Sequence, residues 1–120
     1  MKQVNILRNI VLFIAISAPG VALSAEQEYQ TRVTRTLIDS VNYGQCMALT
    51  FPGPQGTGLN CGGGWVTFSC SGDFNSKSAG NLKLQSAMLS IVTGKNVAIV
   101  IDDTKKHNGY CFARRIDNIE

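Results

Sequence analysis

The sequence predicts a small β domain of five strands and one helix, in the order β-β-β-α-β-β, held together by disulfide bonds. Three observations predict this class. Short runs rich in β-branched and aromatic residues alternate with segments rich in Gly, Pro and Asn. A single segment, residues 77–93, changes to helical spacing. All four cysteines lie beyond residue 45, in the part of the chain expected to be exported.

Residues 1–25 have the features of a secretory signal peptide. Lys2 and Arg8 precede the apolar run at residues 10–16, which is far shorter than the roughly 20 residues of a membrane-spanning helix. Small residues follow, so we expect cleavage after Ser24 or Ala25, an uncleaved anchor being the alternative. The remainder, residues 26–120, is expected to be one secreted or periplasmic domain without membrane insertion.

The cysteine pattern predicts disulfide bonds and no metal site. An even number of cysteines in an exported chain favours two disulfides among Cys46, Cys61, Cys70 and Cys111. Zinc-ligand spacing is absent and the chain has one histidine, so we expect neither a metal nor another cofactor.

The charge balance argues against nucleic acid as a partner. Without Lys2 and Arg8, nine basic and eight acidic side chains remain, a net charge of +1. The basic residues are scattered along the chain, whereas a protein that binds a polyanion normally has a basic face.

The first two strands are expected at residues 28–40 and 45–51. β-branched residues are frequent in the first, and the turn Asn42-Tyr43-Gly44 separates the two because Asn and Gly tolerate positive φ. The Pro- and Gly-rich residues 52–58 end the second strand.

The third strand is expected at residues 65–70, directly after the triple glycine of residues 62–64. Val66, Phe68 and Cys70 alternate on the face expected to enter the core. We expect the glycines to form a bend that turns Trp65 in over the end of the barrel. The alternative is an exposed aromatic platform of Trp65 and Tyr43 for a sugar ring.

The helix is expected over residues 77–93, with Asn75 or Ser76 as its N-cap and Gly94 at its C-terminal end. Leu82 and Leu89 lie on its outer face, as an interface between subunits or as a mildly apolar surface. The stripe expected to face the core spans about 140° and contains Leu84, Ala87, Met88, Ile91 and Val92.

The fourth strand is expected at residues 96–101 and the fifth at residues 110–116, with a polar loop over residues 102–109 between them. This order of elements is that of the five-stranded Greek-key barrel that binds oligonucleotides or oligosaccharides, the OB-fold. A plain α+β sandwich is the structural alternative.

The barrel order suggests a disulfide pairing. The third and fifth strands are neighbours in that barrel, so Cys70 would pair with Cys111 and leave Cys46 for Cys61. Three pairings are possible from sequence alone.

The chain resembles the pentamer-forming B subunits of bacterial AB-type toxins, most closely the subtilase-cytotoxin kind. The residues that carry this resemblance are Cys46 and Cys61, the helix at residues 82–92 and the turn and strand at residues 93–101. The resemblance implies an OB-fold and binding of cell-surface glycans. None of the family's sugar-contacting residues matches a position here.

Candidate ligand-binding residues come from two turns. Tyr43 lies in the first, and the loop between the last two strands is one lip of the ligand surface in barrels of this type. Hydrogen-bond donors and an aromatic ring gather there: Lys105, Lys106, His107, Asn108 and Tyr110.

No catalytic residue is assigned. His107 with Asp102, Asp103 and a nearby serine would suggest a hydrolase, but no nucleophile motif accompanies them. The sequence therefore predicts a non-enzymatic binding domain, either a glycan-binding, homo-oligomeric toxin-like subunit or a monomeric envelope protein with a structural or protein-binding role.

Overall fold

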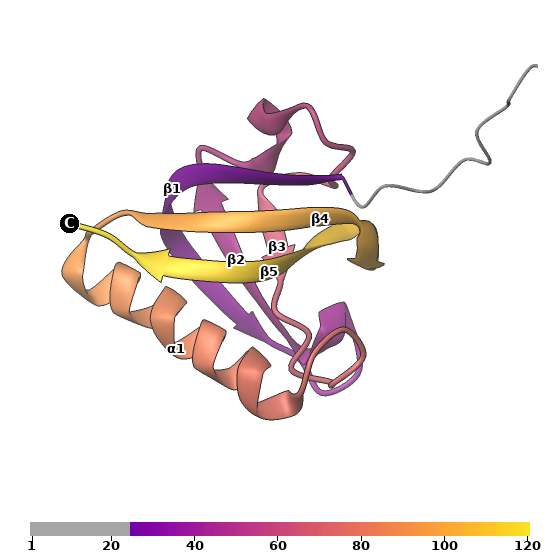
Figure 1. Cartoon of the computed structure of the whole chain (residues 1–120). Helices are drawn as coiled ribbons and strands as arrows, with labels where there is room; N and C mark the ends of the chain where they lie inside the picture. The colour runs from indigo at the N-terminus through magenta and orange to yellow at the C-terminus, as the bar shows by residue number, and fades with distance from the viewer. Residues whose placement is uncertain (1–24) are drawn as a thin grey trace, which may run out of the picture.

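The computed structural model describes residues 25–120, which form a β-barrel of five strands with one helix packed along it (Figure 1). The predicted order of elements is confirmed. The signal-peptide prediction, apart from residue 25, lies outside the described residues. The elements are β1 (Glu26–Ile38), the 3₁₀ turn η1 (Tyr43–Gln45), β2 (Cys46–Phe51), the 3₁₀ turn η2 (Pro54–Thr57), β3 (Trp65–Thr67), α1 (Lys77–Thr93), β4 (Val97–His107) and β5 (Tyr110–Asn118).

The ladder runs β1-β2-β3-β5-β4 and returns to β1, so the sheet closes. The first half of β1, to Thr31, pairs with β4 and its second half, from Arg32, pairs with β2, with a register shift between Val33 and Arg35 shortly after the strand changes partner. β3 and β5 pair in parallel at Thr67 and Phe112, and the remaining pairs are antiparallel. This is the predicted Greek-key order, in which β3 neighbours β5.

The interior of the barrel is filled by β-branched and aromatic side chains. Phe68, Val66 and Ile99 are fully buried, and the β-branched run at the start of β4 contributes Val97 and Ile101. Val66, Phe68 and Cys70 belong to the core, as predicted. The predicted strand over residues 65–70 is too long, because β3 ends at Thr67, and Thr67 and Ser69 of the opposite predicted face are buried as well. A closed sheet keeps water from the inward side of every strand, which accounts for the buried Val97, Ile99 and Ile101 of β4.

α1 has the bounds that the sequence predicts, because both ends are set locally. The Ser76 hydroxyl accepts a hydrogen bond from the Ala79 N–H, and Gly94 ends the helix in a left-handed conformation at φ 68°. Figure 1 shows α1 lying against one side of the barrel, with its axis along the strands of that side.

The face that α1 buries differs from the prediction. Leu84 and Ala87 are buried, but Met88, Ile91 and Val92 of the predicted stripe are exposed. Small residues make the contact instead: a side chain at Gly80 would lie 2.9 Å from the Cys70 Cα. The stripe was wrong at three of its five positions, because a close approach of two backbones favours residues that add no apolar bulk.

Ser90 supplies the second part of that contact. Its hydroxyl donates to the Lys95 carbonyl at 2.7 Å and accepts from the Val33 N–H at 3.3 Å. Val33 lies next to the register shift in β1. The Ser90 hydroxyl therefore provides a partner for a buried strand N–H at this irregular point of the ladder.

The hairpin of β4 and β5 corrects the predicted loop at residues 102–109. β4 continues to His107, and only Asn108 and Gly109 form the turn, with φ 52° and 85°. Such positive values are typical of a two-residue type I′ hairpin. Lys105, Lys106 and His107 are therefore strand residues, although their polar sequence resembles a loop.

The disulfides pair Cys46 with Cys70 and Cys61 with Cys111, so the predicted pairing was wrong. Strand contacts explain the difference. The Phe68 N–H donates to the Cys46 carbonyl, which brings the residues after β3 beside the start of β2. The loop before β3 instead rests on the hairpin turn, where the Gly62 N–H donates to the Gly109 carbonyl at 3.0 Å.

Candidate functional site

A shallow hollow of about 190 Å³ lies on the outside of the barrel, over β1, β2 and β3. It is beside the loop between β1 and β2 and the start of β5. Arginine is the one charged residue type in its lining, and three of the six lining residues are aromatic: Arg35, Leu37, Tyr43, Met47, Trp65 and Tyr110. This face and these loops are where barrels of this type bind their ligands.

Strand register places Arg35 beside Trp65. Arg35 on β1 lies opposite Leu49 on β2, and Leu49 lies opposite Trp65 on β3, so the three form one row across the sheet. The Arg35 Cζ is 5.9 Å from the centre of the Trp65 ring. At this distance a guanidinium is attracted to the ring face. The pair forms one side of the hollow.

Met47 lies deepest in the hollow. It pairs with Leu37 on β1 and with Thr67 on β3, and only 1% of its surface is exposed. Its flexible thioether fills the space between the neighbouring rows, as methionine commonly does. The base of the hollow is therefore apolar, while its charged group lies at the side.

Two tyrosines form the other side. The ring centres of Tyr43 and Tyr110 are 6.0 Å apart with planes inclined at 56°, within the range of favourable aromatic pairs. Tyr110 is the first residue of β5, and Tyr43 belongs to the loop between β1 and β2. Two segments far apart in the sequence thus meet over the apolar base.

The backbone around Tyr43 is strained. Tyr43, Gly44 and Gln45 have φ values of 61°, 65° and 72°, three consecutive residues in the left-handed region. Each residue other than glycine loses about 1–2 kcal/mol in this conformation. Strain of this kind persists only where surrounding contacts impose it, and it concentrates at functional sites.

Asp39 supports the same loop from its start. Its Oδ1 accepts hydrogen bonds from the Asn42 N–H at 2.7 Å and the Val41 N–H at 2.8 Å. These bonds, with that from Asn42 the larger cause, lower the pKa of Asp39 below its usual value. The carboxylate therefore stays ionised and caps the loop at neutral pH.

The structure divides the predicted ligand-binding residues into two groups. Tyr43 and Tyr110 line the hollow, and the Asn108 Oδ1 accepts a hydrogen bond from the Tyr43 N–H at 2.8 Å. Lys105, Lys106 and His107 are absent from the lining. These three residues belong to β4, where side chains alternate between the two sides of the sheet, and only the next two residues form the turn. The predicted polar loop over residues 102–109 would have placed all of them together.

Trp65 corrects a further expectation. The bend in the triple glycine is present, with Gly63 at φ 73°, but it does not turn Trp65 into the barrel. The indole is half-buried on the outside and joins Tyr43 in the hollow, as in the platform alternative.

Arg35, Leu37 and Met47 line the hollow but were not among the predicted binding residues. For Met47 the signal was its place between the core residues Cys46 and Ala48, which puts it on the outward side of β2. Strict alternation would place Arg35 and Leu37 on the side of the buried Val33, and only the register shift between Val33 and Arg35 turns them outward. Their contribution depends on the register between strands, which one sequence does not show.

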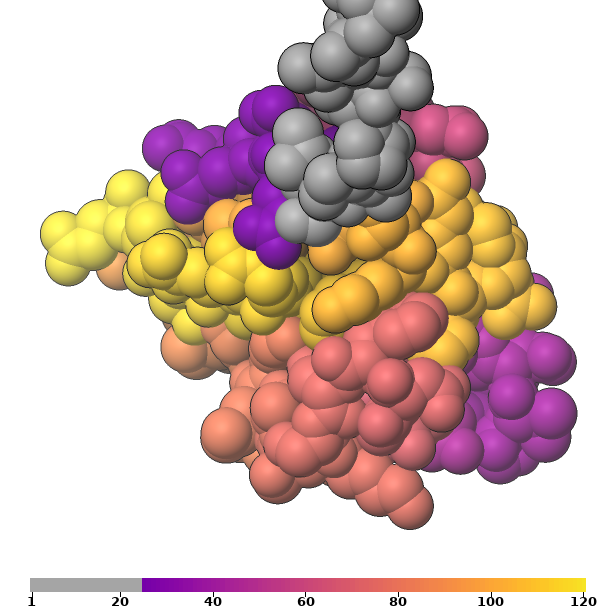
Figure 2. Space-filling view, turned by 45° about the vertical axis from the view of Figure 1, so that its right-hand side comes forward, coloured from indigo at the N-terminus to yellow at the C-terminus, as the bar shows by residue number. Residues whose placement is uncertain are grey.

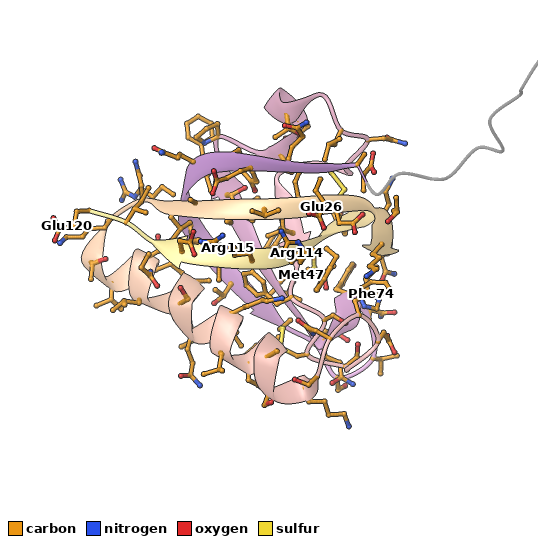
Figure 3. All side chains as sticks on the ribbon, viewed as in Figure 1. Glu26, Met47, Phe74, Arg114, Arg115 and Glu120 are labelled. Atoms are coloured by element: carbon orange, nitrogen blue, oxygen red, sulfur yellow. A yellow bond between two sulfur atoms is a disulfide. The ribbon has the colours of Figure 1, made fainter. Side chains whose placement is uncertain are left out.

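His107 lies in a separate cluster beside the loop that precedes α1. Its ring stacks on Phe74 with centres 4.4 Å apart, and Figure 3 shows Phe74 in that loop. In Figure 2 the loop before α1 packs against the β4–β5 hairpin. The His107 Nε2 is 3.2 Å from the Ser69 hydroxyl and 3.6 Å from an Asp73 carboxylate oxygen.

This cluster does not have the geometry of a Ser-His-Asp triad. In a triad the serine and the carboxylate contact opposite ring nitrogens, whereas here both are nearest to Nε2. Ser69 is fully buried, and its hydroxyl also accepts from the Phe74 N–H. Asp102 is engaged with the Thr104 N–H and hydroxyl instead of the histidine. The cluster joins the loop to the hairpin.

The disulfide between Cys61 and Cys111 holds the two halves of the hollow together. Cys111 directly follows Tyr110, and Cys61 lies four residues before Trp65. The staple thus fixes the loop that carries Trp65 to the strand that carries Tyr110. A small domain depends on such staples because its core alone is thin.

Metal ligands are not gathered anywhere in residues 25–120: no group of three or more His, Cys, Asp or Glu side chains lies close enough to hold an ion. Within the same residues, no helix is long and apolar enough to cross a membrane. No protein-family model, no curated protein and no solved structure matches the chain.

Proposed function

We propose that this chain is a secreted or periplasmic, non-enzymatic domain that binds a cell-surface glycan in the aromatic hollow. The observation that carries the proposal is the meeting of Trp65, Tyr43 and Tyr110 around Arg35 on the ligand-binding face of an OB-like barrel.

The chemistry of the hollow suits a sugar. Aromatic rings offer flat apolar faces to the C–H side of a sugar ring, and the tyrosine hydroxyls and the Arg35 guanidinium offer hydrogen bonds to its hydroxyl groups. At about 190 Å³ the hollow is smaller than the roughly 300 Å³ of pockets that enclose whole small molecules. It fits the exposed end of a larger molecule better than a free metabolite.

Two further features support an exported, non-enzymatic role. Two disulfides suit an oxidising compartment, in agreement with the signal-like residues 1–25. His107, the one histidine, is held in a structural cluster, and the hollow contains no pair of groups arranged for acid-base catalysis.

The test of glycan binding is a pair of substitutions measured on a printed array of mammalian cell-surface glycans. Trp65→Ala removes the ring from the hollow, whereas Phe51→Ala removes a 78% exposed ring that does not line it. Loss of one stacking ring should weaken binding about tenfold, from about 1.5 kcal/mol of aromatic contact. Equal array signals for the two variants, both with unchanged thermal unfolding, would contradict the assignment of the hollow.

Self-association is the second part of this proposal. The outward side of α1 exposes Leu82 (65%), Leu89 (51%), Met88 (47%) and Val92 (82%) and carries no charged side chain among them. Depletion of charge is typical of the centre of an interface. We propose that this side packs against a second copy, so Leu82→Lys with Leu89→Lys should reduce the solution mass measured by light scattering. An unchanged mass would reject this interface.

The same exposed side favours one alternative function, a monomeric envelope protein that binds another protein through α1. A monomeric mass for the unaltered protein, together with an array that gives no signal, would support this alternative. An oligomer that binds arrayed glycans would support the toxin-subunit-like function.

A further inference from the structure

The loop that carries Tyr43 does not hold its shape through its own sequence. Three consecutive residues are left-handed, and two of them, Tyr43 and Gln45, lack the conformational freedom of glycine. Contacts from other parts of the chain must therefore impose the conformation that points Tyr43 at the hollow.

Both backbone polar groups of Tyr43 are held by side chains from distant parts of the chain, a hairpin turn and β3. Its N–H donates to the Asn108 Oδ1 at 2.8 Å, and its carbonyl accepts from the Thr67 hydroxyl at 3.1 Å. The next carbonyl, that of Gly44, accepts from the Ser71 N–H at 3.0 Å. Asn108 is 65 residues away from Tyr43 in the sequence, so this contact exists only in the folded barrel.

Asn108 is well placed to act as a fixed support. It occupies the first position of the two-residue turn, with φ 52°, and the ladder pair of His107 and Tyr110 closes the turn. Tyr110 is joined to this turn through the backbone, and Tyr43 is joined to it through the Asn108 side chain. One rigid turn therefore sets both tyrosines of the hollow.

We propose that Asn108 is a positioning residue: its side-chain oxygen fixes the Tyr43 ring in the hollow and does not itself contact the ligand. This proposal rests on the function proposed above, which makes the hollow the glycan site. It replaces the direct ligand contact that the sequence predicted for Asn108.

Two substitutions distinguish the effect of the Asn108 side-chain oxygen from the effect of the turn conformation. Asn108→Gly keeps a residue that accepts positive φ but removes the oxygen. Asn108→Asp keeps both an oxygen in that position and tolerance of the left-handed region. The first readout is hydrogen exchange of the Tyr43 amide, with the Gly62 amide as control because it reports on the turn through its bond to the Gly109 carbonyl.

For Asn108→Gly we expect at least about tenfold faster exchange at Tyr43 and unchanged exchange at Gly62. On the printed array of mammalian glycans, the half-saturating concentration should rise about fivefold, the effect of one hydrogen bond. Asn108→Asp should restore both values to within about twofold of the unaltered protein.

The outcomes distinguish this proposal from the proposed function. Unchanged Tyr43 exchange in Asn108→Gly overturns the positioning role, and so does faster exchange with unchanged affinity for the array. Failure of the unaltered protein to bind the array overturns the glycan function alone, and the exchange comparison then still decides whether Asn108 fixes Tyr43.

Discussion

Gly44 is the position where the site loop is least able to accept a side chain. A Cβ there would lie 2.4 Å from the His107 Cδ2 and 2.5 Å from the Thr67 Oγ1, and the residue has φ +65°. Gly44→Ala therefore combines a backbone penalty with a steric one. We expect it to destabilise the domain and displace Tyr43.

The two penalties give the expected magnitude. The left-handed conformation costs alanine about 1–2 kcal/mol, and overpacking of a filled region typically costs about 1–3 kcal/mol. The free energy of unfolding should fall by about 2–5 kcal/mol. For a domain of this size, each kcal/mol shifts Tm by about 4–8 °C, so the loss should be at least about 8 °C.

Gly94→Ala is the matched control. Gly94 has φ +68° but nothing lies within 4 Å of a Cβ added there, so this variant carries the backbone penalty alone. The free energy of unfolding of Gly94→Ala should be about 1–2 kcal/mol lower than that of the unaltered protein. Urea unfolding of the oxidised protein, followed by the fluorescence of Trp65, measures both variants.

A second substitution tests whether the clash with His107 causes part of the loss in Gly44→Ala. Adding His107→Ala to Gly44→Ala removes the nearest ring atoms, so the double variant should lose less stability than the two single losses added together. Equal destabilisation by Gly44→Ala and Gly94→Ala, within about 0.5 kcal/mol, would refute the claim that the loop is packed against His107 and Thr67.

Three further predictions concern Tyr29, the disulfide between Cys61 and Cys111, and Arg35. Burial raises the pKa of Tyr29 to about 12, so the folded protein keeps this proton above pH 10 where the unfolded chain loses it, and stability should fall between about pH 10 and 12. Tyr29→Phe should remove that alkaline loss, measured by urea midpoints, and an equally steep loss in the variant would contradict it. Replacing Cys61 and Cys111 together by Ser removes a cross-link between residues 50 positions apart. The free energy of unfolding should fall by about 4 kcal/mol, and most array binding should be lost. Retained binding at full stability would show that this disulfide does not hold the hollow together. Arg35→Met should weaken array binding about fivefold and lower Tm by only a few degrees, because the guanidinium contributes about 0.5–1 kcal/mol of attraction to the half-buried Trp65 ring. Unchanged affinity would remove Arg35 from the site.

Local chemistry made much of the fold predictable. The ends of α1 depend on a serine cap and a left-handed glycine within a few residues of the helix, and both were expected from the sequence. The apolar run of β4 and the presence of two disulfides were equally visible. The face of α1 was not, because its contact depends on Gly80 and Ser90, whose role appears only when the helix meets the barrel.

The sequence by itself determined that this is a mainly β domain with one helix and two disulfides, and two of its predicted binding residues, Tyr43 and Tyr110, line the hollow. Tertiary structure decided which cysteines pair, that Trp65 faces outward, and that Arg35 joins the two tyrosines. The physical reason is the same in each case. Strand register and closure of the barrel bring together residues that are dozens of positions apart, and no local pattern in one chain encodes that register.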